Sequence, residues 1–587
     1  MGFIMKKLTF LLLIAIALPC QAQQMVGRVE ISSPDEIISL RESGFSIYHD
    51  ELEGVVDLVV TEADIDLLEE MGYPLSDLVP LPGGGFLDLD PEYHTYEEFS
   101  DELQQIASLY PDLTRLDSIG HATQFPRTIW SMKISDNAAT EEDELALFYI
   151  GIHHACEAVG GETLLYMMNH LLENYGIDPE ITSWLDNYEI FFIPLLNPDG
   201  HFAVTSGINE FWRKNARDIN NNGIYYEFTG GTWWTDDHEG VDLNRNYNWY
   251  WELGGSNYIW DHDYRGTEPF SEDETQAMEV LAREQRFVCG ITFHSYGEVI
   301  IYPWLFNGQP APDQDVLDVM AIEMAQCFIK DNGSPYDYED YNGRNGQCRN
   351  WFYGFGGALA FCVELNPYPM FLPPGSQLQE RTQRYYEGAK YLLERLDGPG
   401  ITGHVKDAVT GLPLAARVEI QGRISEQVRS RFTEPEYGRF TRLLNYGTYT
   451  VFAGKPGYQT VRIENVMVSG GNMTELVIEL SPITLDVAEQ TRSNETQKPE
   501  IRIDRTSGSL VHFTLELPQR SHIKIELFNV SGRNLGTIYE GIKEAGWPKV
   551  HYNAAHLASG MYFYKITAEG LERGGNFVDA GKMLLLK

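Results

Sequence analysis

The chain has 587 residues, of which 86 are acidic and 43 are basic, so its formal net charge is −43. This balance argues against nucleic acid or an anionic membrane as a partner, because both bind through basic surfaces. Hydrophobic residues make up 43% of the chain and aromatic residues 12%, which excludes a largely disordered protein. At this length we expect three or four folded domains.

Residues 1–22 have the layout of a secretory signal peptide. Lysines precede an apolar run from Leu8 to Leu18, and we expect cleavage near Ala22. Cys20 leaves a lipoprotein as the alternative, although Pro19 fits poorly in front of a lipidated cysteine. Beyond this segment no apolar run is long enough to span a bilayer, so we expect no transmembrane segment in the mature chain.

Residues 23–85 form a short unit of their own. Val55–Val60 is predicted to be a strand, and the amphipathic stretch Glu62–Met71 is predicted to be a helix. The glycine-rich stretch Leu81–Gly85 is a linker and a candidate cleavage point. The unit is either a folding or inhibitory propeptide or a permanently attached subdomain.

Candidate metal ligands follow two apolar runs. The first run, Leu145 to Ile152, is predicted to be a buried strand, and His154 and Glu157 follow it, three residues apart as on one face of a helical turn. His294 follows the second run, Val288 to Phe293. Two histidines and a glutamate with one open position are a standard ligand set for catalytic zinc. Open α/β sheets place their sites at such strand ends.

The neighbouring His153 competes with His154 for the metal. His153 stands four residues from Glu157, so we assign it to the surroundings of the site. The H-x-x-E spacing also occurs by chance in many proteins, and it identifies a site only together with other groups.

Those other groups are two arginines, an asparagine and a glutamate. Arg213 and Arg245 lie in polar segments beside aromatic residues, and Asn244 adds a neutral donor. Arginine grips carboxylates with a planar fork, so this cluster suits a substrate carboxylate or an oxyanion, with surface salt bridges as the alternative. Glu364 lies in the apolar run Ala358 to Leu365, where a bare carboxylate is costly. A carboxylate beside zinc-activated water is a natural general base.

From about Tyr93 to Leu396 the chain resembles the zinc carboxypeptidase family, typified by the pancreatic digestive carboxypeptidases and their bacterial relatives. The resemblance rests on an ordered set of motifs: H-x-x-E (154–157), N-P-D-G (197–200), W-R-K (212–214), D-x-N-R-N (242–246), S-E-D-E (271–274), H-S-Y (294–296) and F-x-V-E-L (361–365). It implies a catalytic domain at residues 86–398 with an α/β fold, in which helices flank a mixed, mainly parallel sheet.

The resemblance also implies residue roles. The zinc ligands would be His154, Glu157 and His294. Glu364 would activate the water and pass its proton to the leaving amine, and Arg213 would stabilise the oxyanion. The substrate would be held by Asn244 and Arg245, which grip its terminal carboxylate, and by Tyr296.

Three positions depart from the family pattern or set specificity. Cys156 stands where the family has an arginine, which should weaken contacts to the peptide upstream of the cut. The family's mobile tyrosine aligns with Asn342, so we assign its role to the adjacent Tyr341. Arg349 aligns with the floor of the side-chain pocket and predicts a preference for C-terminal aspartate or glutamate, unless it pairs with a surface acid.

One insert resembles a calcium loop. Its first half matches D-x-N-x-N-G at Asp218, Asn220, Asn222 and Gly223. The twelfth position is Thr229 rather than glutamate, so the full pattern fails, although Asp236, Asp237 and Glu239 offer further oxygens nearby. A bound Ca²⁺ and a solvated Asn-Gly turn both stay open.

The remainder is predicted to be two all-β sandwich domains, because short alternating strands follow one another with glycine turns. Residues 400–482 resemble the transthyretin-like or carboxypeptidase regulatory-like domain, with a structural role, and residues 483–499 form a polar linker. Residues 500–587 resemble the C-terminal sorting domain of the type IX (Por) secretion pathway, with an Ig-like adhesion module as the alternative. The sorting domain implies a secreted or cell-surface protein, exported across both membranes of a Gram-negative bacterium by secretion machinery.

The sequence thus predicts a secreted zinc carboxypeptidase acting on peptides or proteins with a free C-terminus. A zinc amidase or deacylase for cell-wall peptides or modified amino acids is the first alternative, and a catalytically silent surface binding module is the second. Removal of Cys20 leaves five cysteines, so at least one thiol is free and the chain is no disulfide scaffold. At most, Cys348 is expected to pair with a neighbour.

Overall fold

The structure is a computed structural model. It describes residues 25–32, 36, 39–40, 43, 45–49, 54–80, 92–227, 238–306, 309–340, 345–425, 427–483, 501–505, 510–515, 517, 520–529, 533–543, 548–554, 557, 560–570 and 576–585. The predicted signal peptide and most of the predicted linker lie outside these residues. The chain divides into two compact units: Met1–Lys406, Leu412–Ala453 and Val461–Glu479 form the first, and Asp407–Gly411, Gly454–Thr460 and Leu480–Lys587 form the second.

A small α/β subdomain begins the first unit. Strands β1 (Met25–Glu30), β2 (Ser46–His49), β3 (Val55–Val60) and β4 (Leu75–Pro80) form an antiparallel sheet in the order β2-β3-β1-β4. Helix α2 (Glu62–Met71) is capped at its N-terminus by Thr61, which forms a capping box with Asp64. Leu68 of this helix is buried against the sheet's apolar side chains. The predicted strand and helix of this segment are both confirmed.

An eight-stranded sheet forms the centre of the catalytic domain, in the order β13-β10-β14-β9-β7-β8-β6-β5. The strands are β5 (Thr114–His121), β6 (Thr128–Ile134), β7 (Leu145–Ile150), β8 (Tyr188–Ile193), β9 (Cys289–Ser295), β10 (Val299–Tyr302), β13 (Asp337–Asp340) and β14 (Leu359–Leu365). Parallel pairing joins β14 to β9, β9 to β7, β7 to β8 and β10 to β13. The predicted mixed, mainly parallel sheet is therefore confirmed.

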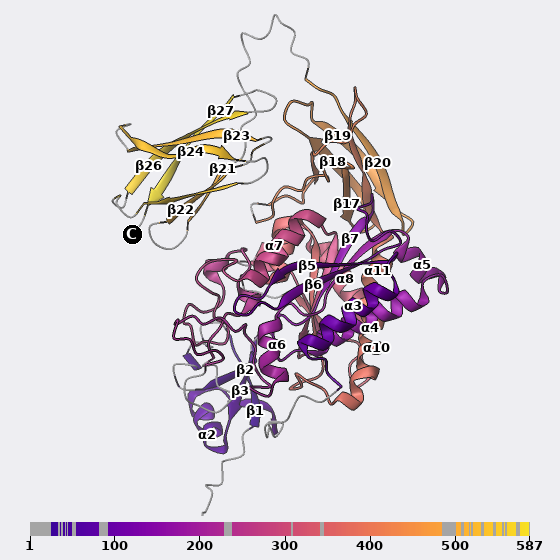
Figure 1. The fold of residues 1–587 in the computed structure, drawn as a ribbon, viewed down its shortest axis with the longest axis vertical. Coiled ribbons are helices and arrows are strands. Elements are labelled where there is room, and N and C mark those ends of the chain that lie inside the picture. The colour runs from indigo at the N-terminus through magenta and orange to yellow at the C-terminus, as the bar shows by residue number, and fades with distance from the viewer. Residues whose placement is uncertain are drawn as a thin grey trace, which may run out of the picture. The chain divides into compact units, whose positions relative to one another are not determined.

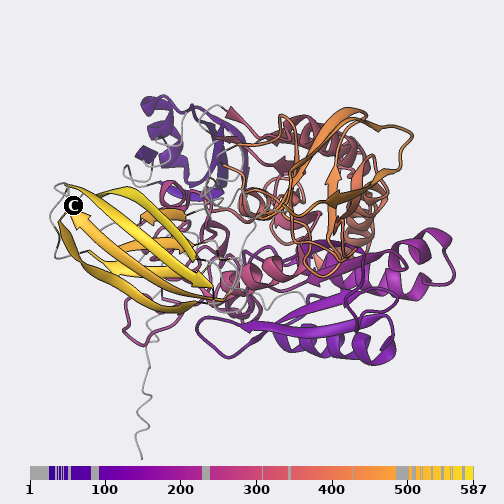
Figure 2. The same ribbon diagram turned by 90° about the horizontal axis from the view of Figure 1, so that it is seen from above.

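Helices flank this sheet (Figures 1 and 2). They are α3 (Tyr96–Leu109), α4 (Val159–Asn174), α5 (Pro179–Leu185), α6 (Pro198–Thr205), α7 (Asp273–Gln285), α8 (Gln314–Cys327), α9 (Cys348–Trp351), α10 (Leu378–Ala389) and α11 (Tyr391–Leu396), with 3-10 turns at Leu243–Arg245, Trp251–Leu253 and Gly375–Gln377 and a π-helical turn at Phe352–Gly356. Short strands β11 (Leu305–Phe306) and β12 (Gln309–Pro310) pair with each other. The inner strands β7, β8, β9 and β14 are buried along almost their whole length, which explains their continuous apolar sequences.

The segment after the catalytic domain is built of β-strands alone. Strands β15 (Gly400–Asp407), β17 (Arg439–Leu443) and β20 (Met473–Leu480) form one sheet, and β16 (Arg417–Ile420), β18 (Gly447–Gly454) and β19 (Val461–Val468) form another. Ion pairs tie it to the catalytic domain within the first unit, because Arg423 binds Asp315 at 2.6 Å and Arg431 binds Asp313 at 2.7 Å. These ion pairs join the two domains.

The second unit is dominated by another all-β domain. One sheet has the order β21-β22-β25 and the other β24-β23-β26-β27. Their strands are β21 (Ile501–Arg505), β22 (Leu510–Leu515), β23 (Ser521–Asn529), β24 (Asn534–Lys543), β25 (Lys549–Asn553), β26 (Gly560–Gly570) and β27 (Asn576–Leu585). Buried side chains alternate along β23, as expected for a strand with one face on an apolar core. The predicted all-β character of this region is confirmed.

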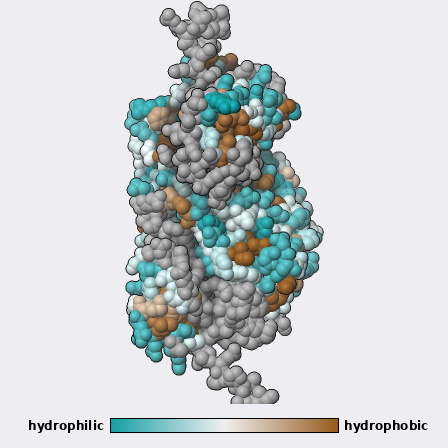
Figure 3. All heavy atoms as spheres, turned by 90° about the vertical axis from the view of Figure 1, so that its left-hand side faces the viewer, coloured by the Kyte–Doolittle hydropathy of each residue, from teal (hydrophilic) through white to brown (hydrophobic). Residues whose placement is uncertain are grey.

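The face drawn in Figure 3 carries hydrophobic residues only in small groups among hydrophilic ones. Among the described residues, no helix has both the length and the apolar character needed to cross a membrane. None of the five cysteines after Cys20, all of which lie in the described part of the chain, forms a disulfide, so the pairing considered for Cys348 is absent from the structure.

Candidate metal centre and substrate site

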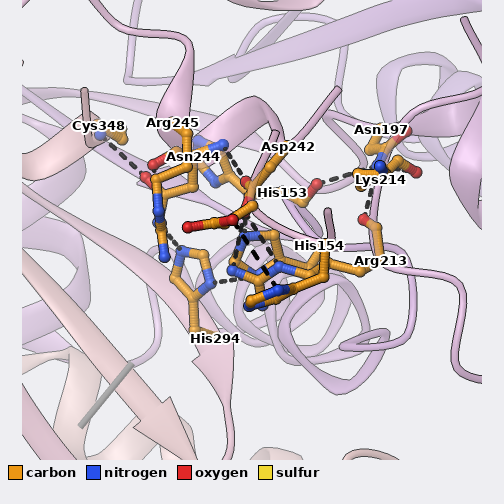
Figure 4. A network of polar contacts seen from close by, with 12 residues as sticks. His153, His154, Asn197, Arg213, Lys214, Asp242, Asn244, Arg245, His294 and Cys348 are labelled. Carbon is orange, nitrogen blue, oxygen red and sulfur yellow. Dashed lines mark hydrogen bonds and ion pairs between the residues drawn. The ribbon is translucent and has the colours of Figure 1, made fainter. Parts of the chain in front are cut away.

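Three buried side chains converge at the carboxyl ends of β7 and β9. His154 Nδ1 lies 2.8 Å from Glu157 Oε1, and His294 Nδ1 lies 2.9 Å from Glu157 Oε2. The two imidazole Nδ1 atoms lie only 3.1 Å apart (Figure 4). The structure therefore brings together the three residues that the sequence predicts as zinc ligands.

The elements that hold these residues differ slightly from expectation. Strand β7 ends at Ile150, and α4 begins at Val159, so His154 and Glu157 lie in a turn between the two elements and not in a helix. The turn is closed by the Glu157 N–H, which donates to the His154 carbonyl at 3.1 Å. His294 lies within β9, one residue before its end.

The electrostatics of the cluster favour an ionised carboxylate. Burial alone would raise the pKa of Glu157, but His154 and His294 beside it hold that pKa well below its usual range. Burial and Arg213 disfavour a charged His154, yet Glu157 and Asp242 outweigh them and raise its pKa. The site thus concentrates a buried negative charge between two imidazoles.

This donor set fits a zinc ion. The candidate ligand atoms of His154, Glu157 and His294 all lie within 4.8 Å of one another, and all three residues are buried. Two ring nitrogens and a carboxylate oxygen that face one another can all donate a lone pair to one cation placed between them. His294 also forms an overlapping group with Cys362 and Glu364, whose candidate ligand atoms likewise lie within 4.8 Å of one another.

Asp242 is part of the site, although the D-x-N-R-N motif that it opens predicted no role for it. Its Oδ1 lies 3.2 Å from His154 Nε2, and its Oδ2 accepts hydrogen bonds from Arg213 Nε at 3.1 Å and Nη2 at 3.0 Å. A metal-binding histidine commonly donates its second ring N–H to a carboxylate, which fixes the ring's orientation. Asp242 provides that carboxylate and also holds Arg213 beside the metal centre. The only sequence feature that could have indicated this role is the position of Asp242 as the first residue of the D-x-N-R-N motif.

Arg213 and the Asn244–Arg245 pair lie next to the metal cluster. Arg213 Nη1 is 3.8 Å from Glu157 Oε1, so its guanidinium borders the cluster directly. Asn244 Nδ2 is 3.3 Å from His294 Nε2, and Asn244 Oδ1 accepts the Cys348 N–H at 2.9 Å. Arg245 is completely buried, and its Nη1 donates to the Asn244 carbonyl at 3.0 Å. Figure 4 shows Arg213, Asn244, Arg245, His294 and Cys348, which come from different segments of the chain.

Glu364 is a fully buried carboxylate in the strand beside His294. Strands β14 and β9 run parallel, and Glu364 is the register partner of His294. Cys362 Sγ lies 3.6 Å from Glu364 Oε1. The carboxylate is therefore fixed beside the metal cluster by the pairing of two strands.

His153 lies apart from the three converging atoms. Its Nδ1 is 3.0 Å from Thr292 Oγ1, and its Nε2 is 3.0 Å from Tyr247 OH. Burial is the main cause that lowers its pKa far below the usual value, so this imidazole is neutral. These contacts agree with its assignment to the surroundings of the site.

Tyr296 lies two residues after His294 and is completely buried. Its hydroxyl donates to Asp57 Oδ2 of the N-terminal subdomain at 2.8 Å. Asp57 also pairs with Arg28 at 2.7 Å, and the Arg28 guanidinium lies 4.4 Å from the centre of the Tyr368 ring. Burial raises the pKa of Asp57, and Arg28 opposes this shift. No pattern in the sequence predicts these contacts.

The remaining predicted positions are placed as follows. Cys156 is buried in an apolar cluster with Tyr296 and Phe371, where it packs as a small hydrophobic side chain. Arg349 is 2% exposed and lies in α9, one residue after the Cys348 N–H that binds Asn244. Tyr341 and Asn342 lie outside the described residues.

An α/β sheet with a His–Glu–His cluster, a buried carboxylate and two arginines defines the class of metal-dependent hydrolases. Comparison with known proteins gives the family. The model of the zinc carboxypeptidase family matches residues 99–388, and that of the carboxypeptidase regulatory-like domain matches residues 400–481.

The matching relatives are carboxypeptidases. Zinc carboxypeptidase A 1 of Anopheles gambiae is 30% identical over 321 residues, which cover 53% of this chain and 69% of the relative. Carboxypeptidase B of Astacus astacus is 28% identical over 308 residues, covering 51% and 95% of the two chains. The crystal structure of a carboxypeptidase A from Helicoverpa armigera shares the fold, with a TM-score of 0.52 and 19% identity over 63% of this chain and 96% of that one. The chain belongs to the zinc carboxypeptidase family and is a metallocarboxypeptidase.

Proposed function

We propose that the protein removes single residues from the C-terminus of peptides or proteins, with zinc held by His154, Glu157 and His294. The observation that carries this proposal is Asn244, which touches His294 on one side and Arg245 on the other. A carboxylate gripped by Asn244 and Arg245 would place the last peptide bond of the substrate against the metal centre. An endopeptidase has no need of such a grip.

The zinc site, Glu364 and Arg213 each suit one part of peptide-bond hydrolysis. Zinc held by His154, Glu157 and His294 would supply Lewis-acid chemistry for polarising the carbonyl under attack and activating a water molecule. Glu364 takes a proton from that water and returns it to the departing amine. Arg213, which Asp242 holds in place, donates hydrogen bonds to the oxygen that gains negative charge.

A pool of peptides followed by mass spectrometry tests this function. Stepwise loss of terminal residues is expected from the zinc-loaded protein and none after chelation. Zinc-loaded protein that leaves every peptide intact would favour the amidase or the binding module. Cleavage of amidated peptides as fast as free ones would favour the amidase alone.

We propose further that Arg349 selects acidic terminal residues, because a buried guanidinium attracts a carboxylate strongly. Arg349→Leu is expected to lower kcat/KM for peptides ending in glutamate by about tenfold or more, as for a lost charge-assisted hydrogen bond. Peptides ending in leucine are expected to gain or stay unchanged. The measurement is kcat/KM on matched peptides that differ only in the last residue. Faster release of leucine or lysine than of glutamate by the unaltered protein would contradict the proposal.

The N-terminal segment, residues 23–85, is proposed to act as an inhibitory propeptide, because Asp57 binds the hydroxyl of Tyr296, a predicted substrate-binding residue two positions after His294. Asp57→Ala is expected to raise the activity of the untrimmed protein about tenfold, because a hydrogen bond to a charged group is lost. Initial rates on one peptide measure the effect, and Asp66→Ala, on the exposed side of α2, is the matched control. If untrimmed and trimmed protein are equally active, the segment is a permanent subdomain.

Export is proposed from the sequence resemblances at the two ends of the chain. Residues 1–22 would direct passage through the inner membrane, and residues 500–587 would direct passage through the outer membrane by the secretion machinery. Two packed sheets in the C-terminal domain suit such a module. The intact mass of the protein recovered from culture medium tests this, since both segments are expected to be missing.

A further inference from the structure

A ring of polar side chains joins the metal cluster to the segment that holds Asn244. Thr292 and His294 lie two residues apart on the same face of β9, and Thr292 Oγ1 is 3.2 Å from His294 Nε2. Thr292 Oγ1 is also 3.0 Å from His153 Nδ1, and His153 Nε2 is 3.0 Å from the hydroxyl of Tyr247. His153, Thr292 and Tyr247 are at most 2% exposed, so these contacts are shielded from solvent.

The ring closes through Cys348. The hydroxyl of Tyr247 forms a hydrogen bond with the Cys348 side chain. The Cys348 N–H donates to Asn244 Oδ1 at 2.9 Å, and Asn244 Nδ2 lies 3.3 Å from His294 Nε2. One proposed metal ligand and one proposed substrate-binding residue therefore belong to a single buried set of polar contacts.

The tautomer of His294 sets the direction of these hydrogen bonds. A ring nitrogen that holds a metal must present its lone pair, so binding through Nδ1 requires the proton to be on Nε2. Asn244 Nδ2 is itself a donor, because Asn244 Oδ1 accepts the Cys348 N–H, and it cannot accept that proton. Thr292 Oγ1 can accept it, and the Thr292 O–H is then directed toward His153 Nδ1.

His153 suits the end of this relay. Burial lowers its pKa far below the usual value, so the imidazole is neutral and has one donor and one acceptor nitrogen. Nδ1 accepts from Thr292, and Nε2 donates to the hydroxyl of Tyr247. The ring is held in place because Asn197 Nδ2 donates to the His153 carbonyl at 3.0 Å and the ring stacks on His294 with centroids 5.4 Å apart.

We propose that His153 is a positioning residue of the metal centre: through Thr292 it fixes the tautomer of His294 whose Nδ1 presents its lone pair to the cluster. Removing such an outer partner of a metal-binding histidine typically weakens metal binding about 10–100-fold. His154 has the carboxylate of Asp242 as its partner, whereas His294 has a hydroxyl whose orientation His153 sets. This role depends on the zinc site of the proposed function, and His153 itself contributes no ligand.

The experiment measures the zinc Kd of the full-length protein by competition with a coloured chelator. His153→Gln places its amide at the position of Nε2 and leaves Thr292 without its acceptor, so Kd is expected to rise about tenfold or more. His153→Asn puts an amide oxygen in the place of Nδ1, so it is expected to bind zinc nearly as tightly as the unaltered protein. If His153 only filled space, the order would be reversed, because asparagine leaves the larger cavity. That reversed order overturns the proposal.

A second variant tests the relay even if His153→Gln folds poorly. Thr292→Val keeps the shape of the side chain but removes the hydroxyl, so it is expected to raise the zinc Kd by about the same factor. The double variant is expected to lose no more than either single one, because both substitutions break one relay. Unchanged affinity in Thr292→Val, or losses that multiply in the double variant, overturn the proposal.

Two control variants and the unaltered protein complete the comparison. Thr163→Val removes a buried hydroxyl that binds the Val159 carbonyl in α4, and His170→Gln removes an imidazole of the same helix, so both should leave the zinc Kd unchanged. A rise in these controls as large as in His153→Gln overturns the proposal. Unaltered protein that binds no zinc overturns the proposed function itself. Tight zinc binding that His153→Gln and Thr292→Val leave unchanged overturns only the role of His153.

Discussion

Glu364→Gln is expected to lower kcat/KM for peptide hydrolysis by about 10²–10⁴-fold, the usual contribution of a general acid–base group. Glutamine keeps the shape of the side chain but cannot accept and return the proton. Glu364 is fully buried and is fixed as the register partner of His294. The loss should therefore fall on kcat, with KM and zinc content little changed. Steady-state kinetics on one peptide, together with metal analysis of the same sample, measure this.

Glu274→Gln is the matched control for this variant. Burial and the neighbouring Glu272 raise the pKa of Glu274 to about 8, so its carboxyl group is mostly protonated at pH 7 and glutamine imitates it closely. Full activity is expected in this control. A Glu364→Gln protein that keeps zinc and more than a tenth of the activity would show that another group moves the proton.

Arg245→Gln is expected to lower kcat/KM by about 10²–10³-fold for peptides with a free C-terminus. Removing one partner of a buried charge pair costs about 2–5 kcal/mol, and Arg245 is completely buried. The loss should fall mainly on KM, since the grip on the carboxylate exists before the reaction begins. Rates for a free peptide and for its C-terminal amide, measured with both proteins, separate this effect from a general loss.

The rate of hydrolysis of the C-terminal amide should change very little in Arg245→Gln, because the amide offers no carboxylate to Arg245. Arg384→Gln serves as the control for loss of an arginine, since Arg384 lies in α10 and pairs with Asp331 at 2.5 Å. Equal losses on the free peptide and the amide would mean that Arg245 supports the fold, and the substrate carboxylate would then need another partner.

Much of the fold follows from the sequence because its central strands are buried on both faces. The apolar runs before His154 and before His294 correspond to β7 and β9, and the run around Glu364 corresponds to β14. The amphipathic stretch Glu62–Met71 predicted α2 to the residue, and in the structure Thr61 and Gly72 cap this helix. Short polar turns carry no such periodic signal, which is why the turn at His154 was expected to be helical.

Residues that act through long-range contacts were harder to predict. Asp242 touches His154, which lies 88 positions away, and Asp57 touches Tyr296 across 239 positions. Only the pairing of distant strands and loops creates such contacts, and a single sequence holds no local signal for them. Glu239 is an intermediate case, because its nearness to the Asp218 loop is visible in the sequence, whereas the hydrogen bonds that its Oε1 accepts from the N–H groups of Ile219 and Asn220 are not.

The pairing of His294 with Glu364 across β9 and β14 also bears on how this enzyme can evolve. Both strands have hydrogen-bonded neighbours on each side, so the two residues change position only if the centre of the sheet is rebuilt. The groups proposed to choose the substrate lie instead on short helical turns and loops, where insertions are tolerated. New substrate preferences can therefore arise by exchange of those turns and loops, while the catalytic residues in the sheet stay unchanged.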